Sequence, residues 1–276
     1  LVKVLEMDIN KLYITVFEDD KDAYNYWLSH GIDKSHIFLG NRDRNFWDVG
    51  NGPCGPCTEI YYDRGEKYDP KHIGIELLAK DIENDRYVEI WNVVFSQYNN
   101  DGKNNYTELA QKNIDTGCGL ERMACVMQEV PTNYDSDFFV NIINKAQEYS
   151  TGMKYNSDAY FTNDTRQKWV NRNYIVIVDH LKASAFAIAD GGSPSGKDRG
   201  AVLRKLIRRA IVCAWFLKLK DGWLDAVIDA IIDANKEYYP YLVERKDDIK
   251  RVIAQENNLF QRTFTNGIKL FEKATH

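Results

Sequence analysis

The spacing of apolar residues changes near Tyr134, and this change limits the folds open to the chain more than any other feature. Before that point, β-branched and aromatic runs at 13–17 and 88–95 predict strands, and the spacing within 22–29 predicts a helix. After it, apolar residues recur three and four positions apart, as on one face of a helix, in segments 138–149, 173–189, 201–217, 223–237 and 245–272. The sequence therefore predicts an α+β fold, with a mixed sheet-and-helix part over 1–137 and an all-helical part over 138–276.

Size and composition exclude several classes of protein. With 276 residues, the chain is long enough for about two domains, and 44% hydrophobic residues can fill a packed core. No apolar run approaches the ~18 residues that cross a bilayer, and no signal peptide opens the chain. Five cysteines do not make a disulfide framework. We therefore expect reduced thiols, a cytoplasmic location and no membrane partner.

The net charge of −5 hides an asymmetry between the two halves. Residues 1–140 carry 14 basic and 25 acidic side chains, whereas 141–276 carry 22 basic and 16 acidic ones. The basic residues concentrate between Lys197 and Arg209, where six of them accompany a single acid. Four of them share one face at helical spacing: Arg204, Lys205, Arg208 and Arg209. Such a face is either simply solvated or in contact with a polyanion such as RNA.

The stretch 40–65 is dense in Gly, Pro, Asn and Asp, so we expect loop until the strand-like Glu59–Tyr62. It contains Cys54 and Cys57 in a C-x-x-C pattern, which is half of a zinc site. A zinc site is not predicted, because no second C-x-x-C follows and the other three cysteines stand alone. Two Gly-Pro-Cys repeats instead favour a stiff loop against a ligand pocket. Trp47 either closes that pocket or is an ordinary core residue.

Several polar residues could carry chemistry in the first half. Glu89 and Asn92 lie three apart on the strand predicted at 88–95, so they point to opposite faces unless the strand twists or bulges. Two of the candidate residues also fit a structural role: Glu89 as a charge on an edge strand and Asp115 as the cap of a turn. An Asp115-Thr116-Gly117 triplet also occurs in aspartic proteases, but those need a second copy or a small all-β dimer.

The residues around this triplet favour a different interpretation. Gly117 and Gly119 allow a ligand to approach the backbone closely, and the helix that follows offers free N–H groups to an anion. Arg122 lies in its first turn, as a cation for a phosphate or as an ordinary surface charge.

Longer motifs resemble the alanyl-tRNA synthetase family, which belongs to the class II aminoacyl-tRNA synthetases. Four of them follow that family's order and spacing in the first half: Asn45–Trp47, Gly52–Ile60, Glu89–Phe95 and Asn113–Arg122. Three more lie in the second half: Asp179–Ala183, Phe186–Gly191 and Arg199–Arg209. The likeness covers essentially the whole chain.

The resemblance implies an antiparallel sheet that binds ATP and alanine, followed by a helical domain that recognises the tRNA acceptor stem. Asp115 would pair with the ammonium of alanine, and Asn92 would orient the amino acid. Trp47 would form a wall of the pocket, and Gly117 would leave room for the methyl group. The implied reaction is alanine–tRNA ligation through alanyl-adenylate.

The resemblance also implies the ATP and tRNA contacts. Arg122 would bind an ATP phosphate beside Gly119, and Glu89 would hold Mg²⁺ with ATP. The residues expected at the tRNA are Lys197, Arg199, Arg204, Lys205, Arg208 and Arg209. Zinc is expected only in the family's editing domain, which this chain lacks, and the oligomeric state is left open.

The chain departs from the family pattern in three ways. It begins after the segment that holds motifs 1 and 2, and it ends before the editing and C-terminal domains, so it resembles a central piece that is expected to be inactive alone. The family reads the acceptor-stem pair G3:U70 partly through an asparagine where this chain has Gly196. A non-catalytic tRNA-binding module derived from the same scaffold is the alternative function.

Overall fold

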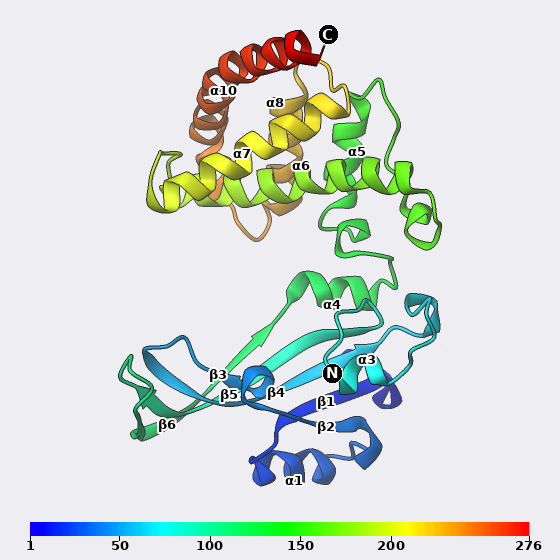
Figure 1. The fold of residues 1–276 in the computed structure, drawn as a ribbon, viewed down its shortest axis with the longest axis vertical. Coiled ribbons are helices and arrows are strands. Elements are labelled where there is room, and N and C mark those ends of the chain that lie inside the picture. The colour runs from blue at the N-terminus through cyan, green and yellow to red at the C-terminus, as the bar shows by residue number, and fades with distance from the viewer. Residues whose placement is uncertain (276) are drawn as a thin grey trace. The chain divides into compact units, whose positions relative to one another are not determined.

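The computed structural model describes residues 1–275, which form two compact units that divide between Val130 and Pro131 (Figure 1). The boundary predicted at 137/138 falls inside the second unit. The functions attached to 1–137 and 138–276 stay predictions. No helix of the described residues is both long and apolar enough to cross a membrane.

The first unit is built on one mostly antiparallel sheet, in the order β2-β1-β4-β5-β6 with β3 paired to β4. Only β1 and β2 pair in parallel. The strands are β1 (Leu12–Phe17), β2 (Ile37–Gly40), β3 (Phe46–Trp47), β4 (Gly52–Asp63), β5 (Tyr87–Asn100) and β6 (Tyr106–Cys118). The helices are α1 (Lys21–Ser29), α2 (Arg42–Asn45), α3 (Glu76–Ala79) and α4 (Leu120–Met127). The strands predicted at 13–17 and 88–95 and the helix predicted at 22–29 are confirmed.

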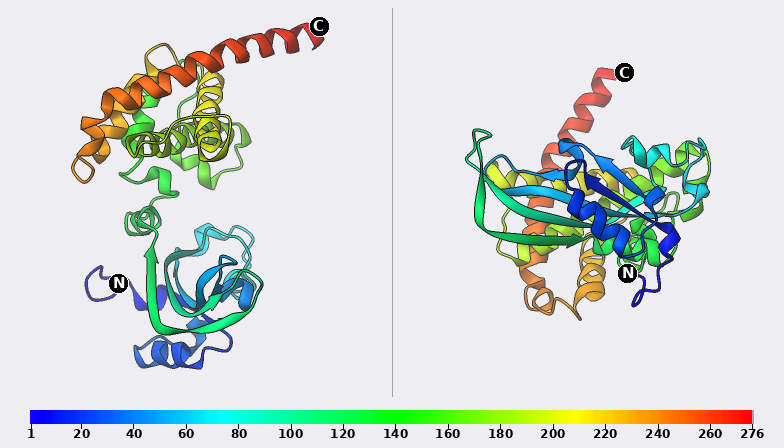
Figure 2. Two further views of the ribbon diagram at one scale, coloured as in Figure 1. Left: turned by 90° about the vertical axis from the view of Figure 1, so that its left-hand side faces the viewer. Right: turned by 90° about the horizontal axis from the view of Figure 1, so that it is seen from below.

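The two faces of this sheet carry different cores. Alternate residues of β1, among them Ile14 and Val16, pack with Ile90 and with Met123 of α4. The intervening Tyr13 packs on the other side with a smaller cluster from α3 and β5. β6 forms one edge of the sheet (Figure 2). Nearly all of its residues are exposed.

The prediction of loop between 40 and 65 is wrong for the Gly-Pro-Cys repeats, which lie inside β4. Proline interrupts strands because it has no N–H to donate. Here the pairing of β4 with β5 slips between Cys54 and Cys57, so the two proline-containing repeats fall at an irregularity of the ladder. Gly55 lies so close to β5 that an added Cβ would come within 1.9 Å of the Phe95 carbonyl oxygen. The glycine therefore serves close strand packing rather than a loop.

The second unit is helical. Its helices are α5 (Val140–Glu148), α6 (Thr165–Ala189), α7 (Asp198–Phe216), α8 (Trp223–Asn235), α9 (Tyr241–Glu244) and α10 (Lys246–Thr275). All five helices predicted after Tyr134 are present, and the predicted α+β fold is confirmed. α6 begins earlier than its apolar pattern indicates, because Asp164 caps it by accepting a 2.9 Å hydrogen bond from the Gln167 N–H. One core of buried aliphatic and aromatic residues joins α5, α6, α7, α8 and α10.

Candidate active site

A bulge in β5 brings Glu89 and Asn92, the two predicted site residues of that strand, to one face of the sheet. Trp91 pairs with Ile60 and Glu89 pairs with Tyr61, so Ile90 is an extra residue between them. Ile90 and Trp91 consequently both pack into the same core, which strict alternation would forbid. Because of this bulge, the side chains of Glu89 and Asn92 share one face of the sheet, which is the face opposite that core.

The edge strand β6 places its predicted residues on this same face. Asn92 lies directly opposite Gly117, and Val94 lies directly opposite Asp115. Side chains that are directly opposite on paired strands project to the same side. The side chain of Asp115 is exposed and makes no hydrogen bond or ion pair with the described residues. A Cβ added at Gly117 would meet nothing within 4 Å, so open space lies above this position.

Asn92 has an unsatisfied amide oxygen. Cys57 of β4 lies nearby, and burial, helped by the charge of Glu59, raises the pKa of its thiol to about 12. The Asn92 Oδ1 atom is buried and accepts no hydrogen bond. Leaving a buried acceptor without a donor costs about 1–3 kcal/mol, so such an atom is suited to receive a donor from a ligand.

Glu59 of β4 is a buried carboxylate beside Asn92, and sequence reasoning gave it no role. It pairs directly with Asn92 and is 9% exposed. Its Oε2 atom accepts hydrogen bonds from Thr15 Oγ1 at 3.0 Å and from the Tyr61 hydroxyl at 2.8 Å. Burial raises the pKa of Glu59 above the ordinary range, and Glu89 adds to the rise. The signal in the sequence is a charged residue in the interior of a strand whose only other charge is its last residue, Asp63.

The predicted ATP ligands Glu89 and Arg122 contact each other. Arg122 Nη1 donates to Glu89 Oε2 at 3.1 Å and to the Glu89 carbonyl oxygen at 3.2 Å. The other guanidinium nitrogens of Arg122 bond nothing within residues 1–275 and remain able to bind an anion. Gly119 is the N-cap residue of α4 and makes no side-chain cap hydrogen bond to the start of that helix.

The side chains near Glu89 fit a magnesium ion that arrives with a nucleotide. No group of three or more metal-ligating side chains occurs among the residues that the structure describes. Mg²⁺ in nucleotide sites commonly uses one or two carboxylates together with phosphate oxygens and waters. Glu89, whose side chain is 32% exposed, supplies one such carboxylate, and Glu59 lies near enough for their charges to interact.

Trp47 is 44% exposed, which excludes the core tryptophan alternative. It lies on β3 and pairs with Gly55 of β4, so it belongs to a strand other than β5 and β6. Cys54 and Cys57 of the Gly-Pro-Cys repeats are both buried, and they lie on a strand rather than in a loop. Their place at a ligand pocket stays a prediction.

In the second unit, the predicted basic face of α7 divides into two pairs. Arg208 Nε donates to Glu256 Oε1 of α10 at 2.6 Å, and Arg204 Nε lies 3.5 Å from Glu256 Oε2. Glu256 is only 3% exposed, so it neutralises two of the predicted cations at the packed side of the helix. The remaining cations of the set are exposed: Lys197, Arg199, Lys205 and Arg209.

A comparison with protein families identifies the family to which the chain belongs. A family model described as tRNA synthetases class II (A) matches residues 1–276. The chain belongs to the class II tRNA synthetase family. The resemblance seen in its motifs is thereby confirmed.

Similar proteins in this family are alanine–tRNA ligases. The enzyme of Ureaplasma parvum serovar 3 is 53% identical over 277 aligned positions, which cover 99% of this chain and 30% of that protein. The enzymes of Malacoplasma penetrans and Mycoplasmoides gallisepticum are each 51% identical, over 97% and 99% of the chain. The synthetase chain thus spans about 30% of the length of these relatives.

Within the synthetase chain, the predicted residues fall into three groups. One face of the sheet carries Glu89, Asn92, Asp115 and Gly117, with Arg122 bonded to Glu89. Trp47 lies on a separate short strand. The tRNA set lies entirely in the second unit, where two of its members are bound to Glu256.

Proposed function

We propose that this chain carries the alanine- and ATP-binding part of an alanine–tRNA ligase, together with a helical unit for the tRNA acceptor stem. The observation that carries the proposal is the β5 bulge at Ile90. It gives one sheet face Glu89, Asn92 and, across the pairing with β6, Gly117. The relatives that share half of the sequence bear the name of this activity.

Alanine would bind over β5 and β6. Its ammonium would pair with the exposed carboxylate of Asp115 and donate to the unsatisfied Oδ1 of Asn92. Its methyl group would occupy the open space above Gly117. Because that space follows from the absence of a side chain, a bulky substituent on β6 at this point would displace the substrate.

ATP would bind beside the start of α4. Arg122 would use the donors not engaged with Glu89 to hold a phosphate, and the N-terminus of α4, which has no side-chain cap, would favour the same negative charge. Glu89 would hold Mg²⁺, which neutralises charge on the phosphates when bound.

The chemistry would then be chiefly positioning. The alanine carboxylate attacks the α-phosphorus of ATP, the bond to the bridging oxygen breaks, and pyrophosphate leaves. A terminal ribose hydroxyl of the tRNA next attacks the alanyl carbonyl and AMP leaves. Asp115 and Asn92 fix the amino acid so that its carboxylate faces the phosphate, and Arg122 offsets the charge that develops there.

The exposed cations of α7 and the loop before it would contact tRNA phosphates. Gly196 offers no amide side chain at the position where the family meets G3:U70. These cations would therefore supply affinity rather than sequence discrimination. A cytoplasmic location is part of the same proposal, supported by five cysteines that all remain free thiols.

Asp115→Asn in the complete gene product tests the proposal. Removing the charge while keeping the shape should cost about 1.5–3 kcal/mol, or roughly a 10- to 200-fold loss in kcat/KM for alanine in ATP–pyrophosphate exchange. Asp101→Asn, which changes an aspartate in the turn between β5 and β6, is the matched control and should leave exchange unchanged. RNA binding without alanine-dependent exchange by the unsubstituted protein would instead favour the non-catalytic module.

A further inference from the structure

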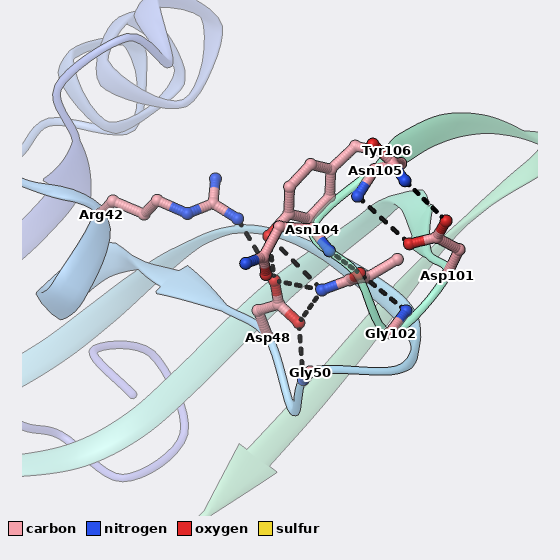
Figure 3. Close-up of polar contacts among 9 residues, drawn as sticks. Arg42, Asp48, Gly50, Asp101, Gly102, Asn104, Asn105 and Tyr106 are labelled. Carbon is pink, nitrogen blue, oxygen red and sulfur yellow. Dashed lines mark hydrogen bonds and ion pairs between the residues drawn. The ribbon is translucent and has the colours of Figure 1, made fainter.

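A polar cluster, in which Asn100 is buried and Asp48 is partly buried, fastens the segment after Trp47 to the turn between β5 and β6. We call it the Asp48 cluster, and it consists of Asp48 and the residues that bond its carboxylate: Arg42, Gly50, Asn100 and Tyr106. All of these except Asn100 are labelled in Figure 3. The Asp48 side chain is 16% exposed, and both of its oxygens are fully engaged. Oδ1 accepts from the Gly50 N–H at 2.8 Å, and Oδ2 accepts from the Tyr106 hydroxyl at 2.7 Å.

Two further donors complete the cluster. Asn100 Nδ2 lies 3.1 Å from each Asp48 oxygen, and Arg42 Nη2 lies 3.2 Å from Oδ2. The hydrogen bond from Tyr106 holds the pKa of Asp48 below its usual range, and the Gly50 N–H adds to the effect. One charged carboxylate thus joins α2, the segment between β3 and β4, and both ends of the β5–β6 turn.

The turn that Asp48 contacts is rigid in its own right. Asn100 is completely buried, and its Oδ1 accepts from the N–H groups of Gly102 at 3.0 Å and Asn104 at 3.2 Å. Asp101 closes the same turn by accepting from Asn105 Nδ2 at 2.8 Å (Figure 3). Asp48 therefore bonds a fixed support rather than a mobile loop.

Phe46 is held to the same support from the other side of Trp47. The Arg42 guanidinium lies over the Phe46 ring at 3.7 Å and over the Tyr106 ring at 4.7 Å. Phe46 also meets the Tyr106 ring edge to face at 6.3 Å. Trp47 lies between two fastened neighbours but remains 44% exposed, as expected where successive side chains of an extended segment alternate in direction.

We propose that Asp48 is a positioning residue that sets the place of Trp47 relative to β6. β6 begins at Tyr106, within the cluster, and carries Asp115 and Gly117 further along. The Asp48 cluster therefore connects β3, which carries Trp47, to β6, which carries the residues proposed to contact the ammonium and methyl groups of alanine. This inference rests on the proposed function, and it assigns to Asp48 the discrimination between alanine and amino acids of slightly different size, such as glycine and serine.

Steady-state ATP–pyrophosphate exchange by the complete gene product tests the inference. Asp48→Ala should raise the KM for alanine roughly 10-fold, because a wall displaced by about 1 Å is costly, while the KM for ATP stays within about 2-fold. The preference for alanine over serine in kcat/KM should fall. Tyr106→Phe, which removes one of the donors, should give a smaller change in the same direction. Lys103→Gln, at an exposed position of the same turn whose side chain the cluster does not use, is the control and should change none of these values.

A second measurement reports on the environment of Trp47 and does not depend on enzymatic activity. The protein is labelled with 5-fluorotryptophan, and Trp47→Phe identifies the resonance of Trp47 among the six tryptophans. Asp48→Asn, which keeps the shape of the side chain, should shift or broaden that resonance and leave the other five in place.

The outcomes separate the inference from the function beneath it. Alanine-dependent exchange by the unsubstituted protein, with an unchanged alanine KM in Asp48→Ala, overturns the inference alone. The inference is also overturned if the KM values for alanine and ATP rise together and all six tryptophan resonances move, because these changes indicate a general loss of structure. No alanine-dependent exchange by the unsubstituted protein overturns the proposed function and the inference with it.

Discussion

Two glycines at the same sheet illustrate how one residue type serves stability at one position and binding at another. Gly55 of β4 lies against the Phe95 carbonyl oxygen, where a Cβ would approach to 1.9 Å. Gly117 of β6 faces open space. The first glycine is required by packing, and the second is required only if a ligand occupies the space above it.

Substituting each glycine by alanine separates these roles. Gly55→Ala should lower the free energy of unfolding by about 1–3 kcal/mol, since the backbone of β5 must move. Gly117→Ala should leave the unfolding midpoint in urea unchanged but reduce kcat/KM for alanine in the complete gene product. Equal loss of stability in both variants would contradict the assignment of Gly117 to the substrate.

The buried carboxyl group of Glu59 leads to a prediction about how the stability of the protein depends on pH. Its pKa is raised by burial in the folded protein, so the folded state holds the proton more tightly than the unfolded state. Stability that depends on this proton is present below the ordinary carboxyl pKa of about 4.3 and is lost as pH rises through the higher folded pKa. Glu59→Gln should therefore gain stability relative to the parent protein as pH rises from about 4 towards neutrality.

Urea unfolding of the parent and Glu59→Gln over this pH range measures the difference directly. Glu83→Gln, at an exposed position, is the control and should show no such trend. A difference between Glu59→Gln and the parent that does not vary with pH would mean that the carboxyl group titrates alike in both states.

At the scale of elements, the packing of α7 against α10 depends on one buried carboxylate. Glu256 forms ion pairs with both Arg204 and Arg208, which are one helical turn apart on α7, and accepts a hydrogen bond from Arg208. Glu256→Ala should cost about 1–3 kcal/mol of unfolding free energy, less than a fully buried pair, because both arginines can still reach water. Asp248→Ala, which breaks exposed pairs with Arg245 and Arg251, should cost less than about 1 kcal/mol by the same measurement.

Strands and helices differ in how far the sequence predicts them. The helices of the second unit follow from apolar spacing, and the strand around Val88–Phe95 follows from its β-branched run. The bulge at Ile90 could not be predicted, because an extra apolar residue in an apolar strand leaves no mark in composition. The same limit applies to Gly55, whose close approach to Phe95 overrides the usual association of Gly and Pro with loops.

The candidate site shows the same division. Residue type and motif order pointed to Asn92, Asp115, Gly117 and Arg122, and the structure places these four around β5, β6 and α4. Glu59 and Glu256 were not found, because each acts through partners distant in sequence: Thr15 for the first and two arginines of α7 for the second. Local patterns cannot show such pairs.

At the scale of the whole molecule, the acidic balance of the first half and the basic balance of the second predict where RNA binds. Lys205→Glu combined with Arg209→Glu should weaken binding of an acceptor-stem RNA, and the salt slope should fall by about 0.9 for every phosphate that is no longer neutralised. Both residues are exposed, so the midpoint of thermal unfolding should not change. A fluorescence anisotropy titration at several salt concentrations measures both the affinity and the slope.

The same titration checks the consequence of Gly196. Without an amide at that position, RNAs with G3:U70 and G3:C70 should bind the chain with little difference, and the double substitution should weaken both alike. A preference of more than about 10-fold for G3:U70 would show that another side chain reads this base pair.

The open edge of the sheet has a consequence for hydrogen exchange. Along Ile114–Cys118, β6 pairs regularly with Trp91–Phe95, and no strand of the described residues pairs with its other side. In an antiparallel edge strand, successive amides point alternately inward and outward. Amide protons of this segment should therefore exchange alternately slowly and quickly, while those of β5, flanked on both sides, should be slow throughout. If another chain segment adds to this edge, the fast amides become slow and the alternation disappears.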